Sequence, residues 1–358
     1  MAESKDKVVR DYVVEQFQRY ENYHKDRFDK AEAIYDRWIG KPPVRKYSWQ
    51  NAVRVPMTFE SEQTITPRLF VALFPNDAPL DIQVEGNAPK EEGIRIKHLI
   101  QHYFRVSQVH SAFHFALRQA TLFGTGYTES GSWFVKRGWI INELGERVYT
   151  ILESRPNCKP VNFFEMYPHP AKVSVDDGLP IIRRRFCDGE YLKTLGENPH
   201  FDFDKLDEAL KSESPVSVPT MLVGADGKAL NLKDKRYEIL EYWGPYDQQV
   251  AKDGKTITQK SVPHWIILIN RSVVVRMIPN PYNHQIPPYV RLKLYEDARQ
   301  SWFGVGTGEI GYPTQERLDK IVNQRLDNVD LVISKQGAYN GNDPLINVKK
   351  LQENMPGR

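Results

Sequence analysis

The feature that most constrains the fold of this chain is a long, two-faced helical pattern between Pro313 and Lys335. Apolar residues recur there every three or four positions, which at about 100° per residue places them in one stripe. Pro313 suits the first turn of such a helix, where its missing N–H costs nothing. The stripe comprises Leu318, Ile321, Val322, Leu326, Val329, Val332 and Ile333. Because an apolar stripe is stable only when protein covers it, this helix needs a partner.

The opposite side of the same helix is polar and nearly neutral. It comprises Glu316, Lys320, Asn323, Gln324, Asp327, Asp330 and Ser334. From residue 316 to residue 330 the acids are Glu316, Asp319, Asp327 and Asp330, and the bases are Arg317, Lys320 and Arg325. The i, i+4 pair of Glu316 and Lys320 contributes only about 0.3 kcal/mol, so the helix is not held together by its own charges. A surface of this kind can touch phosphate groups without holding them.

Composition excludes several classes of protein. Lys and Arg total 49 against 46 Asp and Glu, a formal net charge of +3, whereas tight, sequence-independent duplex binders gather a clear cationic excess. No apolar run approaches the roughly 18 residues of a membrane span, so no membrane partner is expected. The first residues lack the apolar core of a secretory signal, so export by that route is not expected. Two cysteines are too few for a disulfide framework and indicate reduced thiols in the cytoplasm.

Local patterns predict an α+β fold in which helices and antiparallel sheet are segregated. Apolar residues at alternating steps of three and four predict an N-terminal helix at about 5–38, stopped by Gly40 and the prolines that follow. Thr64 and Pro67 suggest a second helix that is capped there and ends before Pro75. Further elements are expected as a strand at 80–86, a helical stretch at 93–123 broken near Ser107, a hairpin with its tip at 142–145, strands at 181–186, 237–242 and 265–269, a short helix at 204–211, and a proline-rich loop at 278–290.

Two groups of glycines invite a nucleotide-binding interpretation that their context does not support. Gly124 and Gly126 form one group, and Gly304, Gly306, Gly308 and Gly311 form the other. A phosphate-binding loop needs Gly-Lys-Ser/Thr at the start of a helix, and a dinucleotide fingerprint needs a βαβ unit with a downstream acid. Both contexts are missing. The glycines are therefore interpreted as turns and hinges.

Other chemistry-bearing residues leave two alternatives open. His98 with His102, and His110 with His114, are i, i+4 pairs at metal-bridging spacing, which keeps a metal-dependent hydrolase as an alternative, although no third ligand or HExxH motif accompanies them. Consecutive arginines at 183–185 keep a nucleic-acid-binding module as another. On a strand they point to alternate faces, so salt bridges at a subunit interface explain them equally well. No catalytic triad spacing is present, and we expect no enzyme activity, catalytic residue, cofactor or metal.

The order of several stretches resembles a known family. "YSWQNAVRVPMTFESEQTITPRLFVALFP", "ALRQATLFGTGYTESGSW", "EYWGPYD", "PNPYNHQIPPYVRLKLYEDARQSWFGVGTGEIGYPTQERLDKIVNQRLDNVDLVI" and "NDPLINVKKLQENMPGR" follow one another over most of residues 45 to 358. Together they resemble the portal, or head-to-tail connector, protein of tailed bacteriophages, in particular the short-tailed type. No single stretch is diagnostic; the order is what makes the resemblance specific.

The resemblance implies a structural virion protein that forms a ring of twelve copies at one capsid vertex, assembled in the host cytoplasm. Double-stranded DNA passes through the ring during packaging and ejection, and the major capsid protein or scaffold, the terminase motor and a tail adaptor contact it. It further implies that residues 1–307 form the wing, 308–335 the first stem helix and 336–358 the start of the clip. A second stem helix, a tunnel loop and a crown are missing from this pattern, so we expect the chain to be incomplete.

Within the implied stem, each side of the two-faced helix has an expected role. The residues expected to face the DNA channel are Glu316, Lys320, Asn323, Gln324 and Asp327. The residues expected to pack between subunits are Leu318, Ile321, Val322, Leu326 and Val329. In a closed ring of heterologous contacts, such a helix can pack its stripe on neighbouring subunits. A channel that passes DNA should bind the duplex weakly, because each additional contact between a cationic side chain and a phosphate strengthens binding and slows the movement of the DNA.

Overall fold

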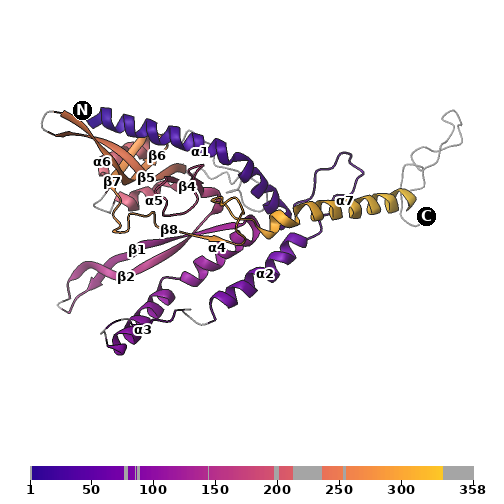
Figure 1. Cartoon of the computed structure of the whole chain (residues 1–358), viewed down its shortest axis with the longest axis horizontal. Coiled ribbons are helices and arrows are strands. Elements are labelled where there is room, and N and C mark those ends of the chain that lie inside the picture. Colours follow the sequence, from indigo (N-terminus) through magenta and orange to yellow (C-terminus); the bar gives the residue numbers. More distant parts are fainter. Residues whose placement is uncertain are drawn as a thin grey trace.

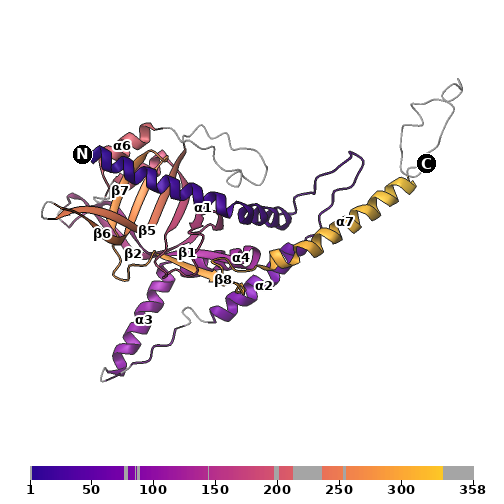
Figure 2. The ribbon, with the colours of Figure 1, turned by 45° about the horizontal axis from the view of Figure 1, so that its top comes forward.

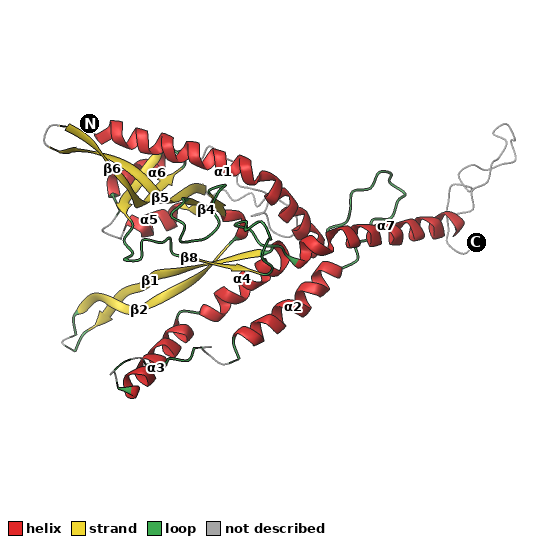
Figure 3. Ribbon diagram, in the orientation of Figure 1, coloured by secondary structure: helices red, strands yellow, loops and turns green. Residues whose placement is uncertain are grey.

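Helices and two antiparallel sheets form a mixed α+β architecture, as the sequence predicts (Figures 1 and 3). The computed structural model describes residues 2–75, 80–84, 86, 89–143, 145–196, 201–212, 236–252 and 255–333. Its helices are α1 (Ala2–Trp38), α2 (Met57–Leu73), α3 (Lys90–Val106), α4 (Val109–Phe123), α5 (Gly189–Gly196), α6 (Phe203–Lys211) and α7 (Thr307–Ile333), with a 3₁₀ turn at Phe163–Glu165. Its strands are β1 (Thr125–Ile141), β2 (Arg147–Val161), β3 (Met166–Pro168), β4 (Ile181–Asp188), β5 (Arg236–Lys252), β6 (Lys255–Ile269), β7 (Val273–Pro279) and β8 (Tyr289–Lys293).

The larger sheet has the strand order β3-β4-β5-β6-β7 and is covered on both faces. One face packs against the first half of α1, where Val13 and Phe17 contact apolar side chains such as Leu240. The other face packs against α5 and α6 through Leu192 and Leu206, among others. Because both faces of the sheet are covered, β5 is buried at every position from residue 237 to residue 243, and its two acids there, Glu238 and Glu241, are paired with arginines.

The smaller sheet has the order β2-β1-β8, but β8 pairs with only the first part of β1, residues 125–129. The remainder of β1 and its partner β2 continue as a two-stranded hairpin that projects from the body (Figure 1). We call residues 132–141 and 147–154 the ribbon. Its turn at Asn142–Glu146 confirms the expected hairpin tip.

The helices between α1 and the hairpin confirm one prediction and correct two. The expected break near Ser107 is present, because Gln108 adopts φ 57° between α3 and α4. The second helix begins at Met57, so Thr64 lies inside it, where its hydroxyl donates to the carbonyl oxygen of Glu60. Residues 80–84 form no strand; Val84 packs against the start of α3 at Gly93.

Helix α7 leaves the body as a single projecting arm (Figures 1 and 2). Its 27 residues correspond to about 40 Å of helix. Beside it lies the extended chain between α1 and α2, residues 39–56, which we call the connector (Figure 2). The helix was expected at 308–335 and is described from Thr307 to Ile333; residues 334–335 and the expected clip at 336–358 lie outside the described residues.

Candidate functional site at the root of the projecting helix

Two glycine stretches that are far apart in the sequence interlock where α7 leaves the body. Gly124 ends α4 with φ +86°, a conformation that favours glycine. A Cβ at Gly306 would lie 2.5 Å from both the Gly124 nitrogen and the Leu122 oxygen, and one at Gly304 would lie 2.5 Å from the Gly124 oxygen. The expected turn is confirmed at Gly124. Gly304 and Gly306 allow two backbone segments to approach more closely than any side chain would permit, and the expected hinge there stays a prediction.

Arg27 of α1 joins this glycine clasp (residues 124–126 and 304–308) to the arm. Its Nη2 donates to the carbonyl oxygens of Phe123 (3.0 Å) and Gly304 (2.7 Å). Its Nη1 donates to both carboxylate oxygens of Glu309, in the first turn of α7, at 3.0 and 2.9 Å. One guanidinium therefore fixes α4, the clasp and α7 relative to α1.

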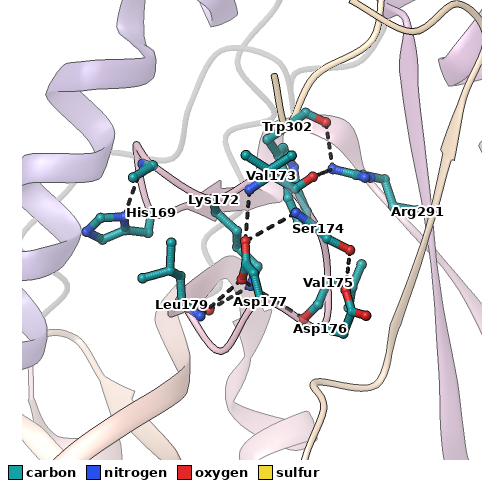
Figure 4. Close-up of polar contacts among 11 residues, drawn as sticks. His169, Lys172, Val173, Ser174, Val175, Asp176, Asp177, Leu179, Arg291 and Trp302 are labelled. Atoms are coloured by element: carbon teal, nitrogen blue, oxygen red, sulfur yellow. Dashed lines mark hydrogen bonds and ion pairs between the residues drawn. The ribbon is translucent and has the colours of Figure 1, made fainter. Parts of the chain in front are cut away.

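A second set of polar contacts lies in the loop 169–179, which is joined through Arg291 to the chain that leads into the clasp (Figure 4). The ammonium of Lys172 is buried and donates to Asp177 (2.5 Å) and to the carbonyl oxygen of Leu179 (2.7 Å). Burial lowers the pKa of Lys172, and its hydrogen bond to Asp177 opposes that effect. Arg291 donates to the carbonyl oxygens of Val173 (2.7 Å) and Trp302 (2.9 Å), so this loop positions the chain that enters the clasp.

The connector is hydrogen-bonded along one polar side of α7. Asp319 accepts from the amide of Val55 (2.9 Å) and pairs with Arg54 (3.0 Å). One turn later, Asn323 accepts from the amide of Val53 (2.7 Å) and donates to its carbonyl oxygen (2.9 Å). The series continues as Gln315 donating to Val55, Asn51 donating to Asp327 and Asn51 donating to Asp330. Side chains spaced by four residues thus pair with an extended backbone.

This arrangement separates the residues that were expected to face a channel. Glu316, Lys320 and Gln324 are exposed and form no ion pair with a described residue. Asn323 and Asp327 are instead half-buried and bound to the connector of their own chain. The polar atoms of these two side chains therefore hold the connector on α7, and their expected place at a channel stays a prediction.

The expected packing stripe has no partner along the outer part of the arm in the described chain. The exposed fractions are 54% for Ile321, 52% for Val329 and 78% for Val332. Leu318 and Val322 are half-buried and Leu326 is exposed. A solitary helix gains little from its own backbone, so most of its stability must come from packing this stripe. The outer part of the arm therefore exposes an apolar stripe that the described residues leave uncovered.

The arginines at 183–185 are bound inside the chain. Arg183 pairs with Glu129 and Glu165, Arg184 with Glu21 and Glu238, and Arg185 with Glu241. Burial by itself raises the pKa of Glu241, but Arg185 and Arg183 outweigh it and hold that pKa below its ordinary value. The alternative explanation by salt bridges is therefore confirmed, but these salt bridges form within the chain and not at a subunit interface. The cluster also offers little for phosphate binding, because Arg183 and Arg184 are buried.

The four histidines of the metal alternative lie on two different helices. His98 and His102 are exposed on α3, whereas His114 makes an edge-to-face contact with Phe70 of α2 and His110 with Phe74, the residue that follows α2. Among the residues that the structure describes, no three His, Cys, Asp or Glu side chains are grouped to hold a metal ion. The rings of His110 and His114 thus fill a contact between helices.

Neither a comparison with models of known protein families nor one with curated protein sequences finds a match to this chain. Within the described residues, every helix is too short or too polar to traverse a lipid bilayer.

Proposed function

We propose that this chain is the subunit of a portal-like ring, the conduit through which double-stranded DNA enters and leaves a phage capsid. The observation that supports this most is the projecting arm with an exposed apolar stripe. In a ring, each arm packs its stripe between neighbouring arms, and identical heterologous contacts close around an axis. The major capsid protein or scaffold, the terminase motor and a tail adaptor would contact the outside of this ring.

The polar side of the arm suits a channel wall. Glu316, Lys320 and Gln324 are exposed and without ion pairs among the described residues, and they add one charge of each sign and one amide. Such a surface is wetted by water and offers the duplex few cationic contacts. The connector lies along the same polar side, where Glu316 and Lys320 line a hollow together with Val44 and Arg54. In this proposal the connector therefore forms part of the channel wall.

The glycine clasp supplies the rigidity that ring closure demands. Closure needs the same rotation at every contact, and a contact that does not close produces open filaments. Arg27 and the interlocked glycines fix the angle between the arm and the body. The direction of each arm is thus set before assembly, and the ring diameter follows from it.

The test is the oligomeric state of the full-length protein, measured by native mass spectrometry and by electron microscopy of negatively stained particles. We expect rings with a central channel, seen end-on as circles. A protein that stays monomeric at high concentration, or that forms only two-fold dimers, contradicts the proposal. Binding to duplex DNA should be weak and should change little between low and moderate salt; tight, salt-sensitive binding would favour a nucleic-acid-binding module instead.

A further inference from the structure

A second apolar surface lies on the ribbon, away from the arm. Trp139 and Tyr149 are cross-strand partners with ring centroids 5.2 Å apart, so they share one face. Side chains two residues apart on a strand point to the same face, so the cross-strand pairs Ile141–Arg147 and Arg137–Ile151 lie on the same face as Trp139 and Tyr149. We call these six residues the ribbon face. Trp139 is 68% exposed, and Arg137 and Arg147 form no ion pair with a described residue.

This ribbon is not a self-sufficient structure. A two-stranded hairpin is marginal in water, and stability requires a third strand or a packed helix. Beyond residue 129, β8 no longer pairs with β1, and the opposite face also exposes Ile140 and Val148. Apolar side chains concentrated on a projecting hairpin indicate a protein contact.

The outer side of α3 has matching chemistry. Ile96, Leu99 and Tyr103 lie within one face of this helix and are exposed, while Gly93 faces inward against Val84. Glu92 falls on the same outer face and forms no ion pair with a described residue, whereas Glu91 is turned about 100° away around the helix. We call Glu92, Ile96, Leu99 and Tyr103 the α3 face. It combines apolar side chains with one carboxylate that has no ion-pair partner among the described residues.

We propose that the ribbon face of one copy packs on the α3 face of a second copy. Trp139, Tyr149 and Ile151 would cover Ile96, Leu99 and Tyr103, which brings Arg147, at one end of the ribbon face, to Glu92, at one end of the α3 face. The charge complementarity selects this occupant, because a second copy supplies an opposite charge to both of these residues, neither of which is ion-paired to a described residue. The two surfaces differ, so the contact is heterologous and repeats from copy to copy. This inference rests on the proposed ring and assigns the contact between its wings.

Cysteine crosslinking tests the contact directly. Burial raises the pKa of Cys187 to about 12 and raises that of Cys158, so the native thiols are poor competitors. Ile151→Cys protein is mixed with Leu99→Cys protein and treated with a short bismaleimide. We expect a crosslinked dimer in the mixture and none in either variant alone. If the mixture forms rings but no crosslinked dimer, the proposed packing of the ribbon face on the α3 face is wrong, whereas the proposed ring is supported.

The double variant, Ile151→Cys with Leu99→Cys, separates the contact from the ring. A ladder of crosslinked species supports both. A product that stops at the dimer supports the contact, as a two-fold pair, and contradicts the ring. No crosslinking in a protein that stays monomeric contradicts both.

Charge reversal provides an independent measurement. Arg147→Glu should lower the crosslinking yield about tenfold, because two carboxylates then face each other. Adding Glu92→Arg should restore it. Thr150→Glu, which adds a carboxylate to the opposite face of the ribbon, is the control and should leave the yield unchanged. A reduction that Glu92→Arg does not restore contradicts the proposed pairing.

Discussion

Arg27 and Glu309 form a two-pronged ion pair between the first helix and the base of the arm, with N–O distances of 3.0 and 2.9 Å. The same guanidinium donates to the carbonyl oxygens of Phe123 and Gly304. Arg27→Met should lower the free energy of unfolding by about 2–3 kcal/mol, because two carbonyl groups lose their donor. Glu309→Gln should cost only about 0–1 kcal/mol, since its side chain remains 32% exposed to water. Urea denaturation of both variants compares the two effects; equal losses would show that the ion pair dominates.

Two glycines of α7 offer a matched pair of substitutions. A Cβ at Gly308 would lie 2.5 Å from Ile34 Cγ2 and 2.7 Å from the Leu122 oxygen, whereas a Cβ at Gly311 meets nothing within 4 Å. Gly308→Ala should therefore destabilise the fold by about 1–3 kcal/mol. Gly311→Ala should be neutral or should stabilise by up to about 1 kcal/mol, because alanine favours the helix. Thermal unfolding decides the matter, and similar values for the two variants would refute the close packing of the clasp.

The docking of the connector on α7 can be followed at single amides. The Val53 amide donates to Asn323, and the Val55 amide donates to Asp319. Asn323→Ala should accelerate hydrogen exchange at Val53 about tenfold, which corresponds to the loss of one hydrogen bond of about 1.4 kcal/mol. Exchange at Val55 should change much less. Gln324→Ala, on the exposed side, should leave both amides at their original rates; acceleration there would place the connector on a different side.

The exposed stripe should be needed for assembly and not for folding. Leu326→Asp with Val329→Asp should keep the melting temperature of the isolated chain, since both side chains are exposed there. Rings should be lost, because two carboxylates would be buried between arms without partners. Lys320→Ala with Gln324→Ala should assemble normally. Electron microscopy and sedimentation compare the variants, and intact rings from the aspartate variant would show that this stripe is not the subunit contact.

His24 predicts an acid-sensitive contribution to stability. Burial lowers the pKa of His24 below its ordinary 6.5, with an opposing effect from its 2.8 Å hydrogen bond to the carbonyl oxygen of Pro168. The unfolded chain therefore binds a proton at His24 before the native state does. The stabilisation is complete above pH 6.5 and is lost as the pH falls towards the lower native pKa. His24→Phe should show a smaller drop in melting temperature between about pH 7.5 and about pH 5.5. An unchanged drop would assign the acid sensitivity to other groups.

Local periodicity was enough to predict much of this fold. The N-terminal helix, the break near Ser107, the hairpin tip at 142–145 and the arm all follow from patterns within a single segment. The predicted strand is not formed at residues 80–84, because alternation over so short a stretch does not require a strand. The predicted cap at Thr64 was wrong, because the hydroxyl of a threonine inside a helix can donate to a carbonyl oxygen of the preceding turn.

The candidate site was less accessible to sequence, because its contacts join distant segments. Nothing near Asn323 reveals that its amide group binds Val53, some 270 residues earlier. The two glycine stretches looked like separate turns because their close approach depends on where α4 and α7 meet. A periodic row of Gln315, Asp319 and Asn323 was the available signal: side chains of this kind, spaced by four, match the donors and acceptors of an extended backbone.

Because the connector is hydrogen-bonded along α7, it also restricts how the length of this helix can change. One residue inserted between Gly308 and Gln315 would turn everything beyond it by about 100° and advance it by about 1.5 Å. The side chains that bind the connector would then point away from it, and the apolar stripe would rotate by the same angle. Working versions of this helix should therefore differ in length by close to whole turns, that is, by three or four residues at a time.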